Sequence, residues 1–223
     1  MHLNIEITGK CNQRCAYCSM PIRKWNELNP ASWLALIQEH GASSVHLTGG
    51  EPLLYSELIP LIGTLKEAGV KASMLSNGSL PQVVEQNQKV FQDLNAAQIS
   101  LDSTDPLVHD SRRGSQGAHS NVMITLGVLR RLEIPLAVSM VVDEKTISSV
   151  HAMAQFCCEI GAKLILRPLA QIGRSNRSFE FDPAFVSDYE EIIVPDPFGY
   201  GAPSIGGHVS QRTLNPAGQL VAA

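Results

Sequence analysis

The feature that most constrains the fold is a repeating unit along the chain. Each unit consists of a short apolar strand, a loop, an amphipathic helix and a glycine that leads into the next strand. Three of the helices end in Glu39-His40-Gly41, Glu67-Ala68-Gly69 and Glu159-Ile160-Gly161. Glycine adopts the left-handed conformation that follows many helices at little cost. Strands that alternate with helices in this way predict a parallel sheet with right-handed crossovers.

The repeat predicts six strands and five helices. The strands are expected at 2–8, 44–48, 71–76, 97–102, 135–143 and 163–167. The helices are expected at 30–40, 57–68, 81–94, 119–132 and 147–160. Asn29-Pro30 is a typical N-cap followed by a first helical proline, and Ser56 is expected to cap the second helix.

The faces of the strands distinguish two forms of this sheet. In the first strand Leu3, Ile5 and Ile7 share one face, and Asn4, Glu6 and Thr8 share the other. A doubly wound sheet is covered by helices on both sides and should be apolar on both. The polar face therefore favours an α/β partial (β/α)6 TIM-like barrel over the doubly wound alternative. Residues 1–173 form the predicted core, and the Gly- and Pro-rich residues 174–223 form a short irregular extension.

Composition excludes several classes of function. Among 223 residues, 17 Lys and Arg oppose 21 Asp and Glu, so the net charge of −4 gives no support for nucleic-acid binding. No apolar run reaches the roughly 18–20 residues of a membrane span, and the N-terminus reads as a strand rather than a signal peptide. Five cysteines, three of them within eight residues, argue against a secreted disulfide scaffold and predict a reducing cytoplasm.

The three clustered cysteines have the spacing Cys11-x3-Cys15-x2-Cys18, just after the first strand. The C-terminal ends of the strands form the working face of parallel barrels. Zinc and electron-transfer clusters normally take four protein ligands, whereas three thiolates on a [4Fe–4S] cluster leave one iron open. The alternative is a zinc site, or a structural cluster, completed by a distant histidine such as His46 or His109.

A second motif follows the second strand and reads Leu47-Thr48-Gly49-Gly50-Glu51-Pro52. Its glycines allow the backbone to approach a ligand closely and leave N–H and C=O groups accessible. A Gly-Gly pair alone is weak evidence, but here it lies one strand–helix unit after a cysteine triad.

The two motifs together resemble the radical S-adenosylmethionine superfamily. The resemblance extends from about residue 2 to residue 174 and is strongest toward the branch of SPASM and twitch peptide maturases and the molybdenum-cofactor cyclase. Its further motifs are Leu75-Ser76-Asn77-Gly78, Ile99-Ser100-Leu101-Asp102, His109-Asp110-Ser111-Arg112-Arg113-Gly114 and Gly173-Arg174-Ser175.

The resemblance implies specific roles for residues of both motifs. Cys11, Cys15 and Cys18 would ligate a [4Fe–4S] cluster, and the main chain at Tyr17 would meet the adenine of S-adenosylmethionine. Gly49, Gly50 and Glu51 would hold the amino end of the methionine moiety.

The later motifs would complete the cofactor site. Ser100 and Arg113 match positions that contact the ribose and the carboxylate, and Ser76 and Asn77 are further candidates. The alternative for Ser76, Asn77 and Ser100 is ordinary polarity at turns and strand ends. The alternative for Arg113 is a charge on a surface loop.

The resemblance also implies a reaction. An electron from reduced flavodoxin or ferredoxin would cleave S-adenosylmethionine, and the resulting 5′-deoxyadenosyl radical would abstract hydrogen from a peptide or a small metabolite. Glu6, Asp102 and Arg167 either orient that substrate or pair with neighbours inside the barrel. Other readings are a glycyl-radical activase, a deazaguanine-type synthase, or a cluster-binding scaffold without turnover.

Residues 205–223 resemble the opening of a SPASM or twitch segment, but they lack its cysteines. Ile205 and Ala223 stand where relatives carry cysteine, and neither side chain binds iron. Either this segment has lost an auxiliary cluster or the chain is a truncated form. In both cases the sequence predicts a single cluster.

Overall fold

A computed structural model describes residues 1–20, 26–181, 191–193, 212–214 and 220–222 of the chain. Its centre is a sheet with the strand order β6-β5-β4-β3-β2-β1-β7-β8, in which β1 to β6 run parallel. These six strands are β1 (His2–Thr8), β2 (Ser44–Gly49), β3 (Lys71–Ser76), β4 (Ala96–Ser100), β5 (Leu136–Val142) and β6 (Lys163–Pro168). All six predicted strands are present, and the largest boundary error is the two residues at the end of β4.

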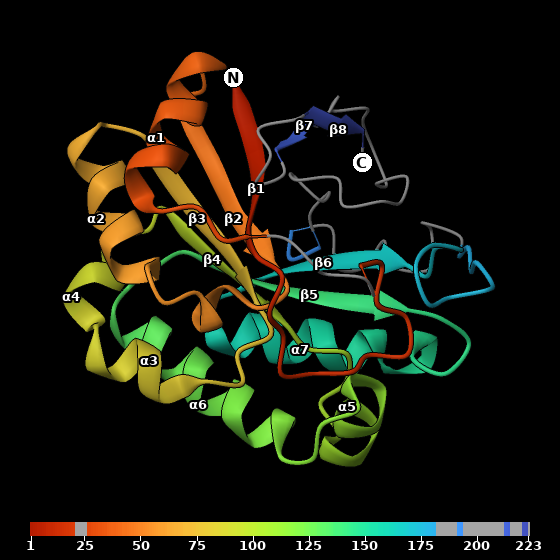
Figure 1. The fold of residues 1–223 in the computed structure, drawn as a ribbon. Coiled ribbons are helices and arrows are strands. Elements are labelled where there is room, and N and C mark those ends of the chain that lie inside the picture. The colour runs from red at the N-terminus through yellow and green to blue at the C-terminus, as the bar shows by residue number, and fades with distance from the viewer. Residues whose placement is uncertain (21–25, 182–190, 194–211, 215–219, 223) are drawn as a thin grey trace.

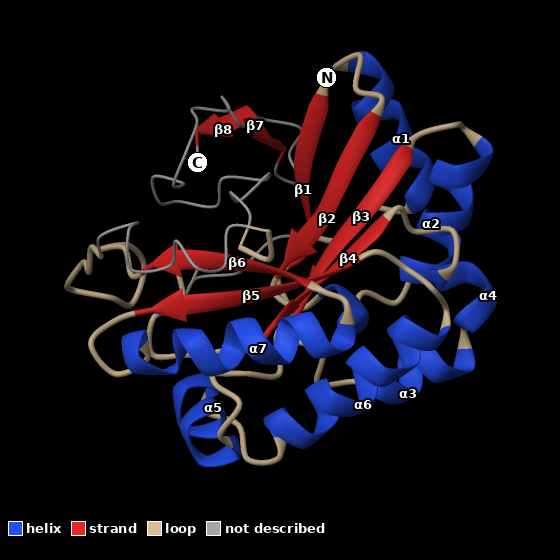
Figure 2. Cartoon of the chain, turned by 180° about the vertical axis from the view of Figure 1, so that it is seen from behind, coloured by secondary structure: helices blue, strands red, loops and turns tan. Residues whose placement is uncertain are grey.

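The helices lie on one side of the sheet, as Figures 1 and 2 show. They are α1 (Pro30–Glu39), α2 (Leu58–Glu67), α3 (Pro81–Gln86), α4 (Gln88–Phe91), α5 (Pro106–Arg113), α6 (Ala118–Arg131) and α7 (Val150–Ile160), with short 3₁₀ helices η1 (Pro52–Leu54) and η2 (Ile147–Ser149). β6 does not pair back with β1, so the sheet is curved but open. The architecture is the predicted α/β partial barrel, and the doubly wound alternative is excluded.

The two faces of the sheet differ as the sequence predicts. On β1, the side chains of Leu3, Ile5 and Ile7 are fully buried in the hydrophobic core. The opposite face is polar even where it is buried, as at Asn4 on β1 and Gln98 on β4. The helices cover the apolar face, and the polar face is left for the interior of the partial barrel.

Most of the predicted helix signals are confirmed. The side chain of Asn29 accepts a hydrogen bond from Ser32 N at 2.9 Å, with Pro30 at the first helical position. Gly41, Gly69 and Gly161 have φ values of 63°, 71° and 70°, the left-handed conformation expected after a helix. The prediction for Ser56 is wrong, because α2 is preceded by Glu57 at the N-cap and has no side-chain cap.

Two helical segments differ from the prediction. The single helix expected at 81–94 is divided into α3 and α4 at Asn87, whose Nδ2 donates to Val83 O at 2.8 Å and so competes with the regular backbone pattern. Helix α5 was not predicted, because only His109 and Arg113 of its residues are buried and no apolar periodicity marks it. Its ends are nevertheless typical, with Asp105 as N-cap and Gly114 in the left-handed conformation at its end.

The predicted irregular extension contains two short strands among its described residues. β7 (Arg212–Leu214) pairs parallel with β1, and β8 (Leu220–Ala222) pairs antiparallel with β7. Ile205 and Ala223, where cysteines are expected from the resemblance, lie outside the described residues. Within the described ranges, every helix is too short or too polar to cross a lipid bilayer.

Candidate cofactor-binding site

The three clustered cysteines lie around one pocket at the C-terminal edge of the parallel sheet. The pocket has a volume of about 190 Å³. Its lining comes from the cysteine-bearing loop after β1, from residues at or just after the ends of β2, β3, β4 and β6, and from Ser139 and Val141 on β5. Cys11, Cys15 and Cys18 are each partly exposed and form no disulfide. The pocket is therefore built jointly by the cysteine-bearing loop and most strands of the parallel sheet, and not by one loop alone.

The cysteine-bearing loop packs directly against the Gly-Gly turn after β2. Gly50 N donates to Thr8 O and Glu51 N donates to Lys10 O, both at 2.7 Å. A Cβ atom built on Gly50 would lie 2.0 Å from Lys10 O, and one on Gly49 would lie 2.3 Å from Thr8 O. Gly49 also has a φ of 129°, which side chains rarely adopt. The glycines are thus required where the two loops meet, in addition to any contact with a ligand.

The end of helix α5 holds the middle of the same loop. Arg14 N donates to Arg113 O at 3.0 Å, and Ala16 N donates to Arg112 O at 3.4 Å. A Cβ atom on Gly114 would lie 2.8 Å from Arg14 O. The motif His109 to Gly114 therefore supplies a backbone support for the cysteines.

The turn after β6 holds the far end of the loop. Arg174 N donates to Cys18 O at 2.9 Å, and Arg174 Nη1 donates to Cys15 O at 3.2 Å. A Cβ atom on Gly173 would lie 2.2 Å from Cys18 O. This explains why the sequence has Gly173 and Arg174 side by side at this turn.

Asp102 is the centre of a buried charge network beneath the loop. Its carboxylate is fully buried and accepts hydrogen bonds from the hydroxyl of Tyr17, from Arg113 Nη2 at 3.1 Å and from Val141 N at 3.1 Å. Arg113 Nε lies 3.0 Å from Asp102 Oδ2, and Arg112 Nε lies 3.7 Å from it. Burial acts to raise the pKa of Asp102, but the two arginines, Arg113 foremost, outweigh it and the pKa is lowered.

The network orients two arginines around Tyr17. The guanidinium carbons of Arg112 and Arg113 lie 4.9 Å and 5.6 Å from the centre of the Tyr17 ring. Arg113 Nη1 also lies 4.0 Å from Cys15 Sγ. Burial raises the pKa of the Cys15 thiol, and the Arg113 charge acts in the opposite direction by favouring the thiolate. Arg113 is therefore a buried cation of the site and not a charge on a surface loop.

On the other wall of the pocket, Asn77 connects the third strand to the cysteines. Asn77 Nδ2 lies 4.0 Å from Cys11 Sγ and donates to Asn12 Oδ1 at 3.0 Å. Asn77 Oδ1 accepts from the hydroxyl and the N–H of Ser79. These bonds fix the amide of Asn77 with its NH₂ group toward Cys11.

Glu51 differs from the other predicted residues in where its side chain lies. It is fully buried and accepts hydrogen bonds from Ser76 Oγ at 2.6 Å, Asn77 N at 2.7 Å and Leu53 N at 3.0 Å. Burial raises the pKa of this carboxyl, and the three hydrogen bonds partly offset the rise. Its carboxylate thus joins the turns after β2 and β3 from behind the pocket.

The structure brings together nearly all of the residues that the sequence singled out. The pocket is lined by Cys11, Cys15, Cys18, Tyr17, Gly49, Gly50, Ser76, Asn77, Ser100 and Arg113, while Glu51 is not part of the lining. Of the three residues considered for substrate orientation, Arg167 lines the pocket and Asp102 is buried in its charge network. The third, Glu6, is half-buried on β1 and is not part of the pocket lining.

Sequence reasoning missed several residues of the site. The motifs contain Arg112 and Arg174, but the sequence predicts no role for either. It also does not predict Ser139 as a site residue, although Arg167 Nε donates to Ser139 Oγ at 2.9 Å within the pocket lining. The signal in the sequence that could have identified Ser139 is that it is a polar residue on β5.

The donor set fits an iron–sulfur cluster better than a single metal ion. Within the described part of the chain, no three His, Cys, Asp or Glu side chains are grouped as ligands of one ion. His46 and His109, the suggested fourth zinc ligands, are not in the pocket lining. A [4Fe–4S] cluster takes each thiolate on a different iron, so three thiols spread around one pocket suit it. The same pocket is also lined by Gly50, Asn77 and Ser100, which would be available to a ligand of the fourth iron.

Comparisons with known proteins agree with this geometry. The family model described as the Radical SAM superfamily matches residues 5–157. An AdoMet-dependent heme synthase of Methanosarcina barkeri is 25% identical over 197 residues, which are 84% of this chain and 55% of that protein. A PqqA peptide cyclase of Gluconobacter oxydans is 26% identical over 251 aligned residues, with 99% of this chain and 69% of the cyclase covered.

Solved structures show the same fold. SuiB of Streptococcus suis bound to S-adenosylmethionine has a TM-score of 0.72 at 17% identity, covering 85% of this chain and 46% of SuiB. SuiB bound to its precursor peptide SuiA has a TM-score of 0.70 at 17% identity and covers 85% of this chain and 44% of SuiB. The chain thus spans about half the length of the heme synthase and of SuiB, and somewhat more of the cyclase.

Proposed function

The chain belongs to the radical S-adenosylmethionine superfamily, and on that premise we propose that it is an enzyme that cleaves S-adenosylmethionine to modify a peptide. The observation that carries this proposal is the convergence of three thiols, a buried arginine and the turns after β2 to β4 on one pocket. The cluster and S-adenosylmethionine are the cofactors of the family, and when bound they supply a 5′-deoxyadenosyl radical that abstracts hydrogen from a substrate.

We assign the roles of the residues from their places in the pocket. Cys11, Cys15 and Cys18 hold the cluster as thiolates. The charge of Arg113 and the amide of Asn77 stabilise the thiolates of Cys15 and Cys11, which they face at 4.0 Å. Hydrogen bonds and nearby charges of this kind set the potential of a cluster.

The remaining lining residues bind the second cofactor. Gly49 and Gly50 present backbone beside the thiols, and Ser100 contributes a hydroxyl group from the end of β4. Ser76 lines the pocket at the end of β3, while its hydroxyl bonds to Glu51 and to Gly78 N. The main chain at Tyr17 meets the adenine. Glu51 acts indirectly, because its carboxylate fixes Ser76 and the N–H of Asn77 rather than entering the pocket.

A peptide is the favoured substrate because several similar proteins are named for peptides. These are the PqqA peptide cyclases and SuiB in complex with its precursor peptide. A small metabolite is the second candidate, since the AdoMet-dependent heme synthase aligns with 84% of this chain. We further propose that a reduced flavodoxin or ferredoxin supplies the electron and that the protein acts in the cytoplasm.

Anaerobic reconstitution tests the proposal. We expect about four irons per chain, a brown protein with a broad absorbance band, and release of 5′-deoxyadenosine from S-adenosylmethionine when dithionite is added. A Cys15→Ala variant should lose both the iron and the nucleoside.

Cys158→Ala is the matched control, because Cys158 is an exposed cysteine on α7 outside the pocket. It should retain both properties. Iron without nucleoside release would favour the scaffold reading, and stoichiometric zinc without iron would reject the cluster altogether. A short precursor-peptide gene beside the gene of this protein would support the peptide substrate.

A further inference from the structure

A second groove lies on the outer side of the cysteine-bearing loop. It has a volume of about 610 Å³ and is formed by that loop, helix α5 and the segments after β5 and β6. Its lining residues are Ala16, Tyr17, Leu107, Val108, Ser111, Arg112, Asp143, Lys145, Leu169, Arg174, Ser175, Asn176 and Arg177. None of the roles assigned to the cofactor pocket requires this groove.

The groove is separated from the cysteine pocket by a thin wall. Tyr17 and Leu169 line both of them. Arg174, on the groove side, donates hydrogen bonds to the main-chain oxygens of Cys15 and Cys18. One residue therefore connects the groove surface to two of the three proposed cluster ligands by direct hydrogen bonds.

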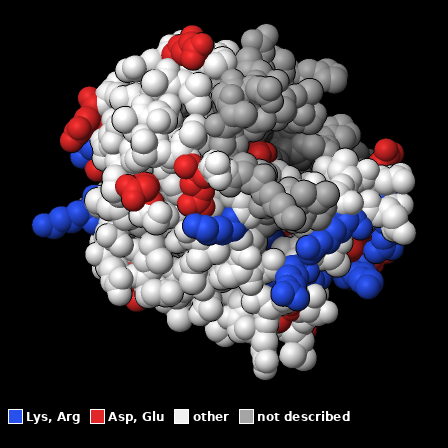
Figure 3. All heavy atoms as spheres, in the orientation of Figure 1, with Lys and Arg blue, Asp and Glu red and all other residues white. Residues whose placement is uncertain are grey.

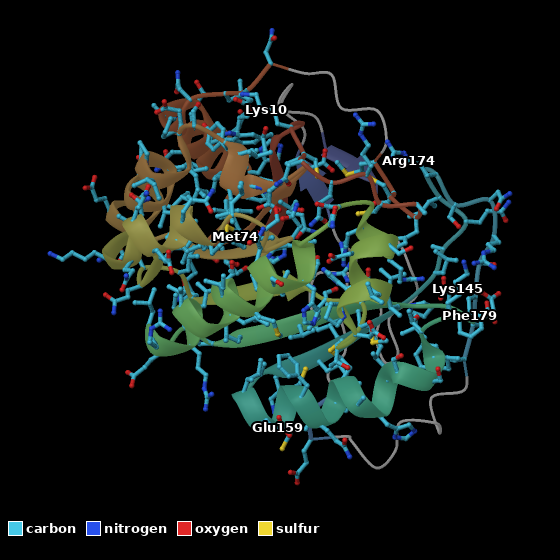
Figure 4. All side chains as sticks on the ribbon, turned by 90° about the horizontal axis from the view of Figure 1, so that it is seen from below. Lys10, Met74, Lys145, Glu159, Arg174 and Phe179 are labelled. Carbon is cyan, nitrogen blue, oxygen red and sulfur yellow. The ribbon has the colours of Figure 1, made fainter. Side chains whose placement is uncertain are left out.

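The groove is positively charged although the chain as a whole is acidic. Its lining contains Arg112, Lys145, Arg174 and Arg177 against the single carboxylate of Asp143, which pairs with the buried Arg112 at 2.8 Å. The excess positive charge of the lining therefore lies on Lys145, Arg174 and Arg177, whereas the whole chain has a net charge of −4. Figure 3 shows Lys and Arg side chains gathered on one side of this face, and Figure 4 places Arg174 and Lys145 along the same side of the molecule.

Two of these cations lie at the surface of the groove. Lys145 is exposed, and no ion pair of its ammonium group is present among the described residues. Arg177 is half exposed, forms an ion pair with Glu144 at 3.1 Å and lies 3.7 Å from Asp143 Oδ2. Beside them Leu107 is 81% exposed, the most exposed of the large apolar side chains described. A cationic groove with an apolar contact at its edge is typical of a protein-docking surface.

We propose that this groove is the docking surface for the acidic one-electron carrier protein that reduces the cluster. The inference rests on the proposed function. One electron passes from the reduced carrier to the cluster, with no atom or proton transferred, so the carrier needs only to approach the thiolates closely. The groove offers that approach from outside, while the substrate and S-adenosylmethionine occupy the pocket within the barrel.

An acidic peptide substrate is the competing occupant. The separating wall argues against it, because a peptide held in the groove would be kept from the pocket by Tyr17 and Leu169. Electron transfer tolerates such a wall, whereas hydrogen abstraction requires contact between the reacting atoms.

The test measures binding of an acidic flavodoxin by calorimetry at low ionic strength. The double variant Lys145→Glu/Arg177→Glu should weaken binding by about 10-fold or more, because both charges on the docking surface are reversed. The difference should shrink near 0.5 M salt, where charges are screened over about 4 Å. This readout does not depend on cluster loading.

A second variant and a matched control keep the test specific. Leu107→Glu, on a different element of the groove, should weaken binding in the same direction, and its new charge near the start of α5 is compatible with the helix. Lys89→Glu/Arg130→Glu makes the same change in net charge on the exposed surfaces of α4 and α6, and should bind like the wild type.

Cleavage assays separate this inference from the proposed function. With dithionite, all variants should release 5′-deoxyadenosine at the wild-type rate, whereas with reduced flavodoxin the groove variants should be slowed. Equal flavodoxin binding by the groove and control variants would overturn the docking surface. Absence of nucleoside with dithionite in the wild type would reject the proposed function instead, whatever the binding result.

Discussion

Asp102 is the residue on which the geometry of the site most depends. It is fully buried, accepts hydrogen bonds from Tyr17 and from the N–H of Val141, and pairs with both Arg112 and Arg113. Removal of one partner from a buried ion pair leaves the other charge uncompensated and typically costs about 3–5 kcal/mol. Asp102→Asn should lower the free energy of unfolding by about that amount, as measured by urea denaturation.

Asp93→Asn is the control for this substitution. Asp93 pairs with the exposed Lys66 at 2.5 Å on the surface, where an ion pair contributes about 0–1 kcal/mol. Equal losses in the two variants would contradict the central role of Asp102.

His109 makes the stability of the protein depend on pH. Burial, followed by the charge of Arg113, lowers the pKa of His109 to about 4 from 6.5. The ring is held neutral, with Nδ1 accepting from Asp102 N at 3.1 Å. The unfolded chain therefore takes up a proton first as the pH falls from about 6.5 to 4, and stability present above this range is lost within it.

Between pH 7.5 and 5.0 this one group should cost about 2 kcal/mol of unfolding free energy. The pKa values of His2 and His46 are also lowered by burial and act in the same direction. The contribution of His109 is therefore isolated by comparing the wild type with His109→Gln. The measured quantity is the free energy of unfolding from urea denaturation as a function of pH. Parallel profiles would show that His109 does not titrate as described.

At the scale of elements, the contact between the Gly-Gly turn and the segment after β1 determines where the cysteines lie. Gly50→Ala would place a Cβ atom 2.0 Å from Lys10 O. Backbone must move to relieve this contact, and such overpacking typically costs about 1–3 kcal/mol. We expect lower iron content after reconstitution together with this loss of stability.

Gly63→Ala is the matched control on helix α2, since a Cβ atom there would meet nothing within 4 Å. Alanine in a helix interior should stabilise by up to about 1 kcal/mol, with iron binding unchanged. Reduced iron in both variants would mean that the contact at Gly50 is not the cause.

The elements also show what can be predicted from sequence. The strands and most of the helices could be predicted from hydrophobic periodicity and from the glycines at helix ends. Both signals lie in residues that are close together in the sequence. Helix α5 could not, because its buried residues are His109 and Arg113, which are buried through their bonds with Asp102 and not through an apolar periodicity. The position of Glu51 behind the pocket could likewise not be predicted from the sequence, because its hydrogen-bond partners Ser76 and Asn77 lie at the end of the next strand.

At the scale of the whole molecule, the described hydrophobic core is contained in the six-stranded partial barrel. Its buried apolar side chains lie between Leu3 and Leu169 among the residues described, and in the described part of the chain β7 pairs with β1 at two positions. A chain that ends at Ile193 should therefore unfold cooperatively. Its free energy of unfolding should lie within about 2 kcal/mol of the full chain, the equivalent of one or two hydrogen bonds.

Urea denaturation followed by circular dichroism gives both quantities in this comparison. Either of two results would show that residues 194–223 complete the core. One is a broad transition, and the other is a urea dependence of the unfolding free energy that falls by more than the removal of these residues accounts for.

The supports of the cysteine-bearing loop come from parts of the chain that are made at very different times. Arg113 is 98 residues and Arg174 159 residues away from Cys15 along the chain. Contacts of such separation form late in folding, because long loops must close first. A newly synthesised chain would expose its thiols before β6 and Arg174 are made, so iron delivered during synthesis would meet an incomplete binding site. Cluster insertion is thus expected to follow the completion of β6, as a final maturation step.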